Sequence, residues 1–187
     1  MLAPARLVRH STSRLKYTDM TNPERNLISI RVATTADAAA ITDVINRAFR
    51  SAENFFVKGD RLDQTEVDRL LSTGTFLLAE AKNVMLGCVY VEPKFAVQSI
   101  RAYLGLLSVD PDQQGGGIGS KLMDAAEDHC RKLGCAFMDI HVVNLRKELP
   151  GFYHRRGYVE TGTSEFPPEV ETKIPCHFIE MSKDIWP

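Results

Sequence analysis

The sequence lacks any apolar run of the roughly 18 residues that a membrane-spanning helix requires, because charged residues interrupt every hydrophobic stretch. It also lacks an excess of either charge, since 23 Lys and Arg residues stand against 24 Asp and Glu residues and the net charge is -1. A basic surface that neutralises nucleic-acid phosphates is therefore not expected. These absences predict a cytoplasmic protein with neither a membrane partner nor a nucleic-acid partner.

Cysteine and histidine are few and scattered. The four cysteines show neither Cys-x-x-Cys spacing nor a close Cys/His cluster, and the five histidines form no His-x-x-x-His pair. A zinc site and a disulfide framework both need such clustering. We therefore expect no metal site, and we expect the cysteines to be reduced thiols that are mostly buried.

Residues 1–27 differ in composition from the rest of the chain. Basic residues alternate with Ser, Thr and small apolar residues, and the first acidic residue is Asp19. This composition is typical of a mitochondrial transit peptide, which makes mitochondrial localisation the alternative to a cytoplasmic one. No apolar stripe of helical period accompanies it, which favours a disordered basic leader or an extension upstream of a start at Met20 over a transit peptide.

The rest of the chain, residues 28–187, is expected to form one domain, since strand and helix patterns alternate through it without a Gly/Ser-rich or Pro-rich linker. Alternating or continuous apolar runs predict strands, and apolar spacings of three and four predict helices. The predicted strands are 28–33, 75–81, 84–93, 101–109, 136–143, 158–163 and 176–183, and the predicted helices cover 40–49, 67–71, 122–133 and 150–157. The order βααβββαβαββ indicates an α/β (α+β) fold, a mixed sheet with helices on its faces.

A glycine-rich turn lies between the apolar strand 101–109 and the helix that follows it. Residues 109–119 read Val-Asp-Pro-Asp-Gln-Gln-Gly-Gly-Gly-Ile-Gly. A helix N-terminus offers free backbone N–H groups and a positive dipole end to an anion, and glycine lets a phosphate approach the backbone closely. The turn is therefore a candidate phosphate site, with an unliganded tight turn as the alternative.

The spacing of this turn excludes two common nucleotide-binding motifs. A Walker A motif needs Gly-Lys-Ser/Thr, but here Lys121 is preceded by Ser120 and followed by Leu122. The Rossmann fingerprint needs Gly or Ala where Ser120 stands, together with an early βαβ unit that the chain lacks.

The turn does resemble the pyrophosphate loop of the GCN5-related N-acetyltransferase (GNAT) superfamily, through Gln114-x-x-Gly117-x-Gly119 after Val109-x-Pro111. A second segment, Phe-Tyr-His-Arg-Arg-Gly-Tyr at 152–158, is similar to the aromatic-Tyr-x-x-x-Gly-aromatic segment of that superfamily. The resemblance covers residues 28–183, and Val-Asn-Leu-Arg-Lys-Glu-Leu at 143–149 is similar to an uncharacterised bacterial and fungal group. It implies the GNAT fold, a mixed and mostly antiparallel sheet with a splay between the fourth and fifth strands and helices on both faces.

The resemblance also implies acetyl-CoA as cosubstrate and a set of residues that bind it. Backbone groups of the strand before the turn would pair with the pantetheine arm, and the turn would offer N–H groups to the pyrophosphate. Asn144 would bond the pantetheine or a water molecule, although it lies farther ahead of Tyr153 than is usual in the superfamily. The implied coenzyme-binding residues are Leu107, Val109, Gln114, Gly115, Gly116, Gly117, Gly119, Ser120 and Asn144.

Tyr153 is the candidate general acid, since a phenol is protonated at neutral pH and can donate to a departing thiolate. The alternative is an aromatic side chain that only packs beside its neighbours. Some members of the superfamily carry a carboxylate or histidine on the strand before the turn, but here the possible positions hold Tyr103, Gly105, Leu107 and Ser108. The candidate bases are therefore Glu92, Glu80 and His141, with deprotonation relayed by water as a further alternative.

The acceptor is expected near two loops, 49–61 and 164–175, where Arg61 could hold a carboxylate and the acids Glu165, Glu169 and Glu171 could attract an amine. The alternative for each of these residues is an ordinary solvated charge. The implied activity is transfer of an acetyl group to a primary amine of a small molecule or of a peptide or protein. The alternatives are a non-catalytic acyl-CoA-binding module on the same fold and an unrelated nucleotide-binding α/β protein. A monomer and a homodimer are both compatible with the sequence.

Overall fold

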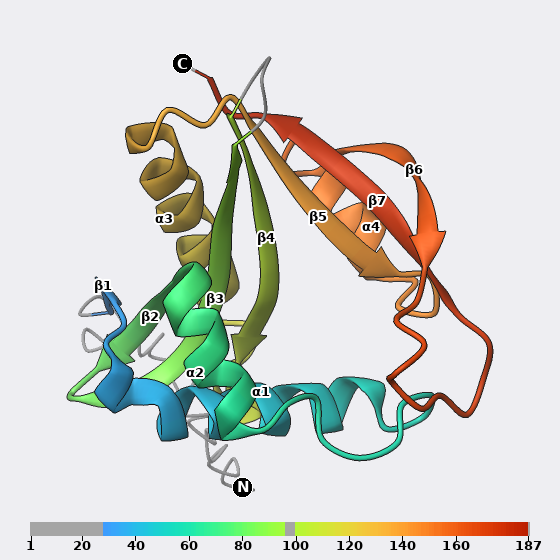
Figure 1. Ribbon diagram of the computed structural model, residues 1–187. Coiled ribbons are helices and arrows are strands. Elements are labelled where there is room, and N and C mark those ends of the chain that lie inside the picture. The colour runs from blue at the N-terminus through green and yellow to red at the C-terminus, as the bar shows by residue number, and fades with distance from the viewer. Residues whose placement is uncertain (1–27, 96–99, 187) are drawn as a thin grey trace, which may run out of the picture.

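Seven strands form one sheet in the computed structural model, which describes residues 28–95 and 100–186 (Figure 1). The strand order is β1-β2-β3-β4-β5-β7-β6, and only the β4–β5 pair is parallel. The strands are β1 (Ser29–Val32), β2 (Thr75–Ala81), β3 (Val84–Phe95), β4 (Ile100–Val109), β5 (Phe137–Val143), β6 (Val159–Glu165) and β7 (His177–Asp184). The predicted mixed and mostly antiparallel sheet is confirmed, whereas the predicted leader 1–27 lies outside the described residues.

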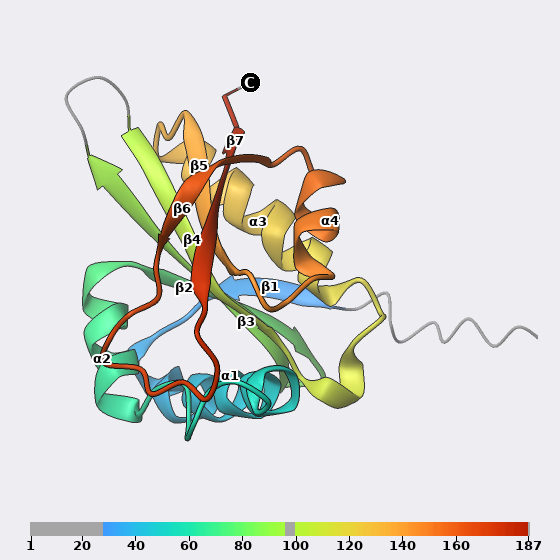
Figure 2. The ribbon, with the colours of Figure 1, turned by 90° about the vertical axis from the view of Figure 1, so that its right-hand side faces the viewer.

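Four α-helices cover the two faces of the sheet, as the sequence predicts (Figure 2). α1 (Ala38–Glu53) and α2 (Gln64–Thr73) pack on one face, and α3 (Ile118–Lys132) and α4 (Leu149–His154) pack on the other. Two short 3-10 turns, Thr35–Asp37 and Pro111–Gln113, precede α1 and α3. The element order agrees with the predicted one, although α4 ends at His154 and a turn completes the predicted segment to Gly157.

Local sequence signals account for where several elements begin and end. The side chain of Asp63 accepts the main-chain N–H of Glu66 at 2.9 Å and so caps α2. Lys82 and Asn83 both have positive φ, 51° and 61°, which is the backbone of a two-residue hairpin turn. Gly134, at φ 81°, ends α3 in the left-handed conformation that favours glycine.

Two hydrophobic clusters fix the helices to the sheet. Under α3, the fully buried Leu122 and Met123 pack against Met138 of β5. Under α1, the fully buried Ile41 and Ile45 pack with Phe76 of β2 and its neighbours. Such burial contributes about 1.5–3 kcal/mol per large side chain, so the sheet is a rigid platform for the loops at its edges.

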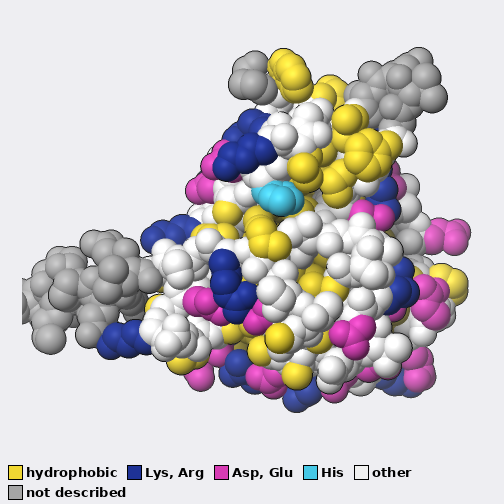
Figure 3. All heavy atoms as spheres, turned by 60° about the vertical axis from the view of Figure 1, so that its left-hand side comes forward, with side chains coloured by type: hydrophobic (Ala, Val, Ile, Leu, Met, Phe, Trp, Pro, Cys, Tyr) yellow, Lys and Arg dark blue, Asp and Glu magenta, His cyan; other side chains and the backbone are white. Residues whose placement is uncertain are grey.

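The surface carries charges of both signs. In Figure 3, Lys and Arg side chains are interspersed with Asp and Glu over one face, and hydrophobic side chains gather near its top. Within residues 28–95 and 100–186, no helix is long and apolar enough to cross a membrane. In the same ranges, no three or more His, Cys, Asp and Glu side chains are grouped so that they could hold a metal ion.

Candidate functional site

The parallel strands β4 and β5 separate halfway along their length. They are paired from Arg101 opposite Phe137 to Leu104 opposite Ile140, and beyond that point they diverge (Figure 1). This is the splay that the resemblance implies, and the structure confirms it.

A β-bulge in β4 accompanies the divergence. Gly105 is paired with Tyr90 and Ser108 with Cys88, so three steps along β4 oppose two steps along β3. The extra residue brings Leu106 to φ 52°, which is unusual for a residue with a branched side chain. A bulge bends its strand and increases the local twist, so β4 turns away from β5 here.

A cavity lies in the splay, between the diverging ends of β4 and β5. We call it the splay cavity. It is lined by Phe49, Glu53, Arg61, Tyr103, Leu104, Gly105, Leu106, Leu107, Ile140, His141, Val142, Val143, Arg146, Leu149, Phe152, Tyr153, Phe166 and Phe178.

A second cavity, the loop cavity, lies over the glycine-rich turn at the N-terminus of α3. It is lined by Leu107, Val109, Gln113, Gln114, Gly115, Gly117, Ile118, Gly119, Ser120, Arg146, Leu149 and Phe152. Four residues line both cavities: Leu107, Arg146, Leu149 and Phe152. The two cavities therefore adjoin, and together they connect the turn to the middle of the sheet.

The backbone of the turn is suited to an anion. Gly117 is the N-cap of α3 at φ 78°, and no side chain caps the helix. The first N–H groups of a helix have no partner within it, so they remain available to a ligand together with the positive end of the helix dipole. Gly115 also has a positive φ of 79°, and a Cβ added at either glycine would meet no atom within 4 Å. The turn thus fits a phosphate group, because its glycines set the conformation and the space around them is open.

The structure brings most of the predicted coenzyme-binding residues together. Seven of the nine line the loop cavity, whereas Gly116 lies in the same turn without lining it. Asn144 lies elsewhere: its Oδ1 accepts the main-chain N–H of His177 at 3.1 Å, and it lines neither the splay cavity nor the loop cavity. Its contact with pantetheine stays a prediction. In the structure, its side chain instead links the end of β5 to the start of β7.

Tyr153 of α4 lines the splay cavity and is 8% exposed. Its ring packs edge-on against Phe152 and Tyr158, with centroid separations of 5.1 Å and 5.8 Å. Burial raises the pKa of the Tyr153 hydroxyl to about 12, so the group is protonated at neutral pH. Among the residues that the structure describes, none is hydrogen-bonded to this hydroxyl, which leaves it free to donate.

The predicted candidate bases are separated by the fold. His141 lines the splay cavity, where its ring contacts Tyr103 at a centroid distance of 5.3 Å and its Nε2 lies 3.9 Å from Oε1 of Glu180. Glu92 does not line the cavity, because its carboxylate accepts from the hydroxyl of Tyr90 at 3.3 Å and is paired with Lys94. Glu80 of β2 is paired with Arg31 and does not line the splay cavity either, so His141 is the one of the three predicted bases that does.

Glu53, the last residue of α1, is a cavity residue that the sequence reasoning missed. It is 7% exposed, and its Oε1 lies 3.9 Å from Nη1 of Arg146. Burial raises the pKa of this carboxyl, while the charges of Arg61 and Arg146 act in the opposite direction. The helical spacing could have indicated that Glu53 is buried, because it lies four residues after Phe49 and eight after Ile45, on the apolar stripe of its helix.

The two loops that the sequence assigns to the acceptor contact each other. Main-chain N–H groups of Lys58 and Lys173 donate across the gap, to Glu171 at 3.0 Å and to Phe56 at 2.7 Å. A β-bridge joins Val57 to Thr172 between these two bonds. The loops therefore form one wall at the far end of the splay.

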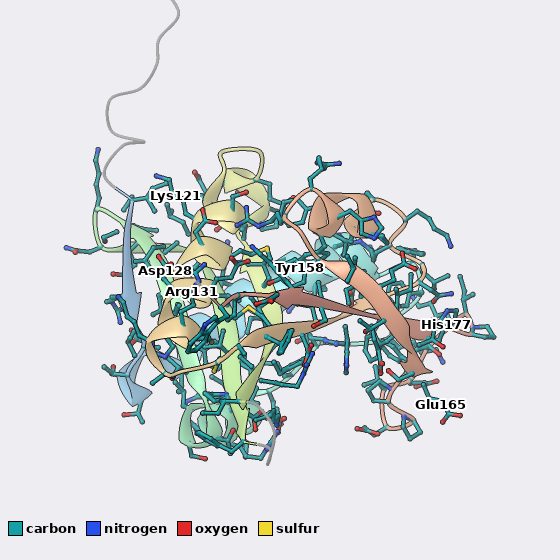
Figure 4. All side chains as sticks on the ribbon, turned by 90° about the horizontal axis from the view of Figure 1, so that it is seen from above. Lys121, Asp128, Arg131, Tyr158, Glu165 and His177 are labelled. Carbon is teal, nitrogen blue, oxygen red and sulfur yellow. The ribbon has the colours of Figure 1, made fainter. Side chains whose placement is uncertain are left out.

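This wall stands away from α3. The β6–β7 loop begins after Glu165 and ends before His177, which are paired in register. Figure 4 shows both on the side of the molecule opposite Lys121, Asp128 and Arg131 of α3. The acceptor loops and the glycine-rich turn thus approach the splay from different sides.

A third cavity, the side cavity, opens behind the α1–α2 loop. It is lined by Phe49, Arg50, Glu53, Asn54, Val57, Gly59, Asp60, Arg61 and Lys173. It shares Phe49, Glu53 and Arg61 with the splay cavity. The splay therefore has one approach from the glycine-rich turn and another from the acceptor loops.

Comparison with known proteins finds one matching family model and curated relatives. Residues 39–158 match the model of the acetyltransferase (GNAT) family. The chain is 29% identical over 143 residues to the uncharacterised N-acetyltransferase YhfO of Bacillus subtilis, a match that covers 71% of this chain and 91% of that protein. It is 35% identical over 63 residues to mycothiol acetyltransferase of Propionibacterium freudenreichii, which covers 34% of this chain and only 20% of that longer protein.

Among solved structures, the PaiA N-acetyltransferase of Thermoplasma acidophilum, in complex with coenzyme A, superposes with a TM-score of 0.66. The superposition covers 84% of this chain and 98% of that one at 17% sequence identity. At this identity, the likeness concerns the fold.

Proposed function

Because the chain belongs to the acetyltransferase (GNAT) family, we propose that it transfers an acetyl group from acetyl-CoA to a primary amine of a small molecule or peptide. The observation that carries this proposal is the adjoining pair of cavities, which leads from an anion-binding helix N-terminus to a buried tyrosine. A thioester donor with a pyrophosphate at one end and its reactive group at the other has this shape.

The donor would be held from both ends of the channel. The N–H groups of the glycine-rich turn, from Gly115 to Ser120, would bind the pyrophosphate. Leu107 lies where the two cavities meet, next to the bulge, so its backbone is a candidate partner of the pantetheine arm. The PaiA N-acetyltransferase, which has a similar fold, was solved with coenzyme A bound, and this supports a coenzyme site on this fold.

Acetyl transfer forms an N–C bond and breaks the thioester C–S bond, while the amine loses one proton and the sulfur gains one. Tyr153 is our candidate for donating to the sulfur, because it lines the splay cavity and its protonated hydroxyl has no hydrogen-bond partner among the described residues. Such a donor would stabilise the charge of the leaving thiolate as it develops.

For the proton that leaves the amine, the geometry points to Glu53. It lines both the splay cavity and the side cavity, and the raised pKa makes its carboxylate a stronger base than an exposed glutamate. His141 lines the splay cavity from β5 and is the second candidate.

The first experiment is calorimetric titration of the full chain with acetyl-CoA, for the wild type and for Gly117→Asp and Gly117→Asn. Asp and Asn are nearly isosteric and both tolerate a left-handed backbone, so the two variants differ mainly in one negative charge. Wild-type binding in the micromolar range is expected, with the Asp variant at least about tenfold weaker than the Asn variant. Equal binding of the two variants would contradict the pyrophosphate site.

Thiol release with a panel of primary amines then tests the transfer itself. Turnover by the wild type supports the proposal. Binding of acetyl-CoA without turnover of any amine would favour the non-catalytic acyl-CoA-binding module instead. Absence of binding to any acyl-CoA would overturn the proposed function.

A further inference from the structure

Arg61 lies where the splay cavity meets the side cavity, and it lines both. Its guanidinium carbon lies 5.1 Å from the ring centroid of Phe49 and 5.8 Å from that of Phe166. Within residues 28–95 and 100–186, no carboxylate forms an ion pair with this guanidinium and no hydrogen bond leaves it. Its donors, held between two aromatic rings at a cavity, are therefore available to a ligand.

The main chain at Arg61 is fixed by Asn46, a residue of α1 that is 6% exposed. The Oδ1 of Asn46 accepts the main-chain N–H of Arg61 at 2.9 Å and that of Leu62 at 3.3 Å. Its Nδ2 donates to the carbonyl oxygen of Leu62 at 2.8 Å. A buried amide that bonds three main-chain groups holds this loop in one conformation, so the position of Arg61 is set by the fold.

Arginine and lysine side chains outnumber acidic side chains around the two cavities that Arg61 lines. Asp60, the preceding residue, is paired with Arg50 at 2.7 Å. Glu53 faces the charges of both Arg61 and Arg146, so even as a carboxylate it balances only one of these two guanidinium groups. The junction of the two cavities therefore carries excess positive charge, which repels polyamines and attracts an oxyanion.

We propose that Arg61 binds the carboxylate of the acceptor, and that this acceptor is a free α-amino acid with an apolar side chain. The inference rests on the proposed acetyl transfer. A guanidinium recognises a carboxylate through two parallel hydrogen bonds, and a peptide N-terminus presents an amide at the same place instead. The side chain of the acceptor would contact Phe49, Phe166 and Phe178, which line the splay cavity.

The carboxylate takes no part in the chemistry under this proposal. The amine of the same molecule reaches the splay cavity, where Tyr153 and Glu53 lie, while the carboxylate is held at the junction. Arg61 then acts as a specificity residue, since it selects amines that carry a carboxylate close to the nitrogen.

The test compares matched acceptors with matched variants of the full chain. L-phenylalanine, L-leucine and L-methionine are each assayed beside their carboxamides by thiol release, after acetyl-CoA binding has been measured by calorimetry. The variants are Arg61→Gln, Arg61→Lys and, as control, Arg69→Gln, which removes an exposed arginine of α2 that pairs with Glu66 and lines none of the three cavities. Thermal unfolding of each variant checks that it is folded.

The wild type and Arg69→Gln are expected to have kcat/KM values at least about tenfold higher for the acids than for the amides. Arg61→Gln should reduce this ratio to about one, chiefly through a higher KM for the acids, with acetyl-CoA binding unchanged, and Arg61→Lys should retain part of it. The inference is overturned if the wild type acetylates the amides as well as the acids, or if it binds acetyl-CoA and acetylates none of the acids. A wild type that binds no acyl-CoA overturns the proposed function itself, so the two failures are told apart by the calorimetry.

Discussion

Leu104 and Ile140 form the last pair of the parallel β4–β5 ladder, and the cavity that holds the candidate chemistry opens directly beyond them. Both residues are 2% exposed and lie in the core under α3. The paired half of the two strands is thus buried and rigid. In the unpaired half, main-chain N–H and C=O groups lack a partner on the neighbouring strand and can bond a ligand. The separation of β4 from β5 therefore creates a binding site while the paired residues stay buried in the core.

Tyr153→Phe is expected to lower kcat about 100-fold or more while acetyl-CoA binding stays within twofold. The substitution removes only the hydroxyl of this cavity-lining residue, and the ring keeps its contacts with Phe152 and Tyr158. Steady-state thiol release and calorimetry measure the two quantities. Tyr90→Phe is the control, because it removes a tyrosine hydroxyl that contacts Thr73 and Glu92 away from the cavity. Unchanged turnover in Tyr153→Phe would remove this residue from the mechanism.

Glu53→Gln tests whether Glu53 is the general base, and the pH dependence of kcat/KM is the measurement. Because the pKa of Glu53 is raised, the carboxylate is lost as pH falls through a value above that of an ordinary glutamate, and kcat/KM should fall with it. Arg61, Arg146 and the thiol of Cys176 are the titratable or charged groups that interact with it. The variant should have a lower rate and no acidic limb at that position. An identical acidic limb in both proteins would assign that limb to a group other than Glu53.

The order of the elements could be predicted from the sequence because its signals are local. The side chain of Asp63 caps α2, and Lys82 and Asn83 form the hairpin turn that their pattern indicates. The glycine-rich turn was equally readable, since Gly115 and Gly117 do adopt positive φ. Each of these features depends on a few neighbouring residues, and tertiary contacts do not override them.

The lining of the splay cavity could not be predicted in the same detail, because it depends on contacts between segments that are distant in the sequence. The burial of Glu53 and the position of Arg61 depend on how the α1–α2 loop folds back over Asn46 and meets the β6–β7 loop. Asn144 shows the converse, since its sequence position suggests a ligand contact and its side chain bonds the main chain of His177. A polar residue near a site has several possible partners, and only the fold decides among them.

Asp37→Asn should reduce stability by about 1 kcal/mol at neutral pH. The guanidinium of Arg31 donates to both oxygens of Asp37 at 2.8 Å and also to Glu80, which holds the pKa of Asp37 well below its usual range. A carboxyl with a lowered pKa stabilises the folded state above its unfolded pKa, and that stability is lost as pH falls. The difference between wild type and variant, measured by urea unfolding, should therefore shrink between pH 7 and pH 3. A difference that is independent of pH would show that the ion pair contributes nothing.

Phe56→Ala addresses the wall that the two acceptor loops form. Phe56 is fully buried, its ring contacts Phe166 at a centroid distance of 6.4 Å, and its carbonyl accepts the N–H of Lys173. Truncation of a buried phenylalanine removes about 3–5 kcal/mol of packing free energy. This cluster lies apart from the two clusters under the helices, so the loss should appear as local opening of the wall.

Hydrogen exchange of the full chain measures this opening. Amides of residues 54–62 and 166–176 should exchange faster in Phe56→Ala, while those of β2 to β5 are little changed. Phe76→Ala is the matched control, because Phe76 is equally buried but lies in the cluster under α1, and its loss should accelerate exchange throughout the sheet. Acetyl-CoA should still bind to Phe56→Ala, since the glycine-rich turn lies on another side of the splay, whereas KM for the acceptor should rise. Uniform acceleration of exchange in Phe56→Ala would show that the wall and the sheet unfold together, and the acceptor loops would then not be an independent element of the site.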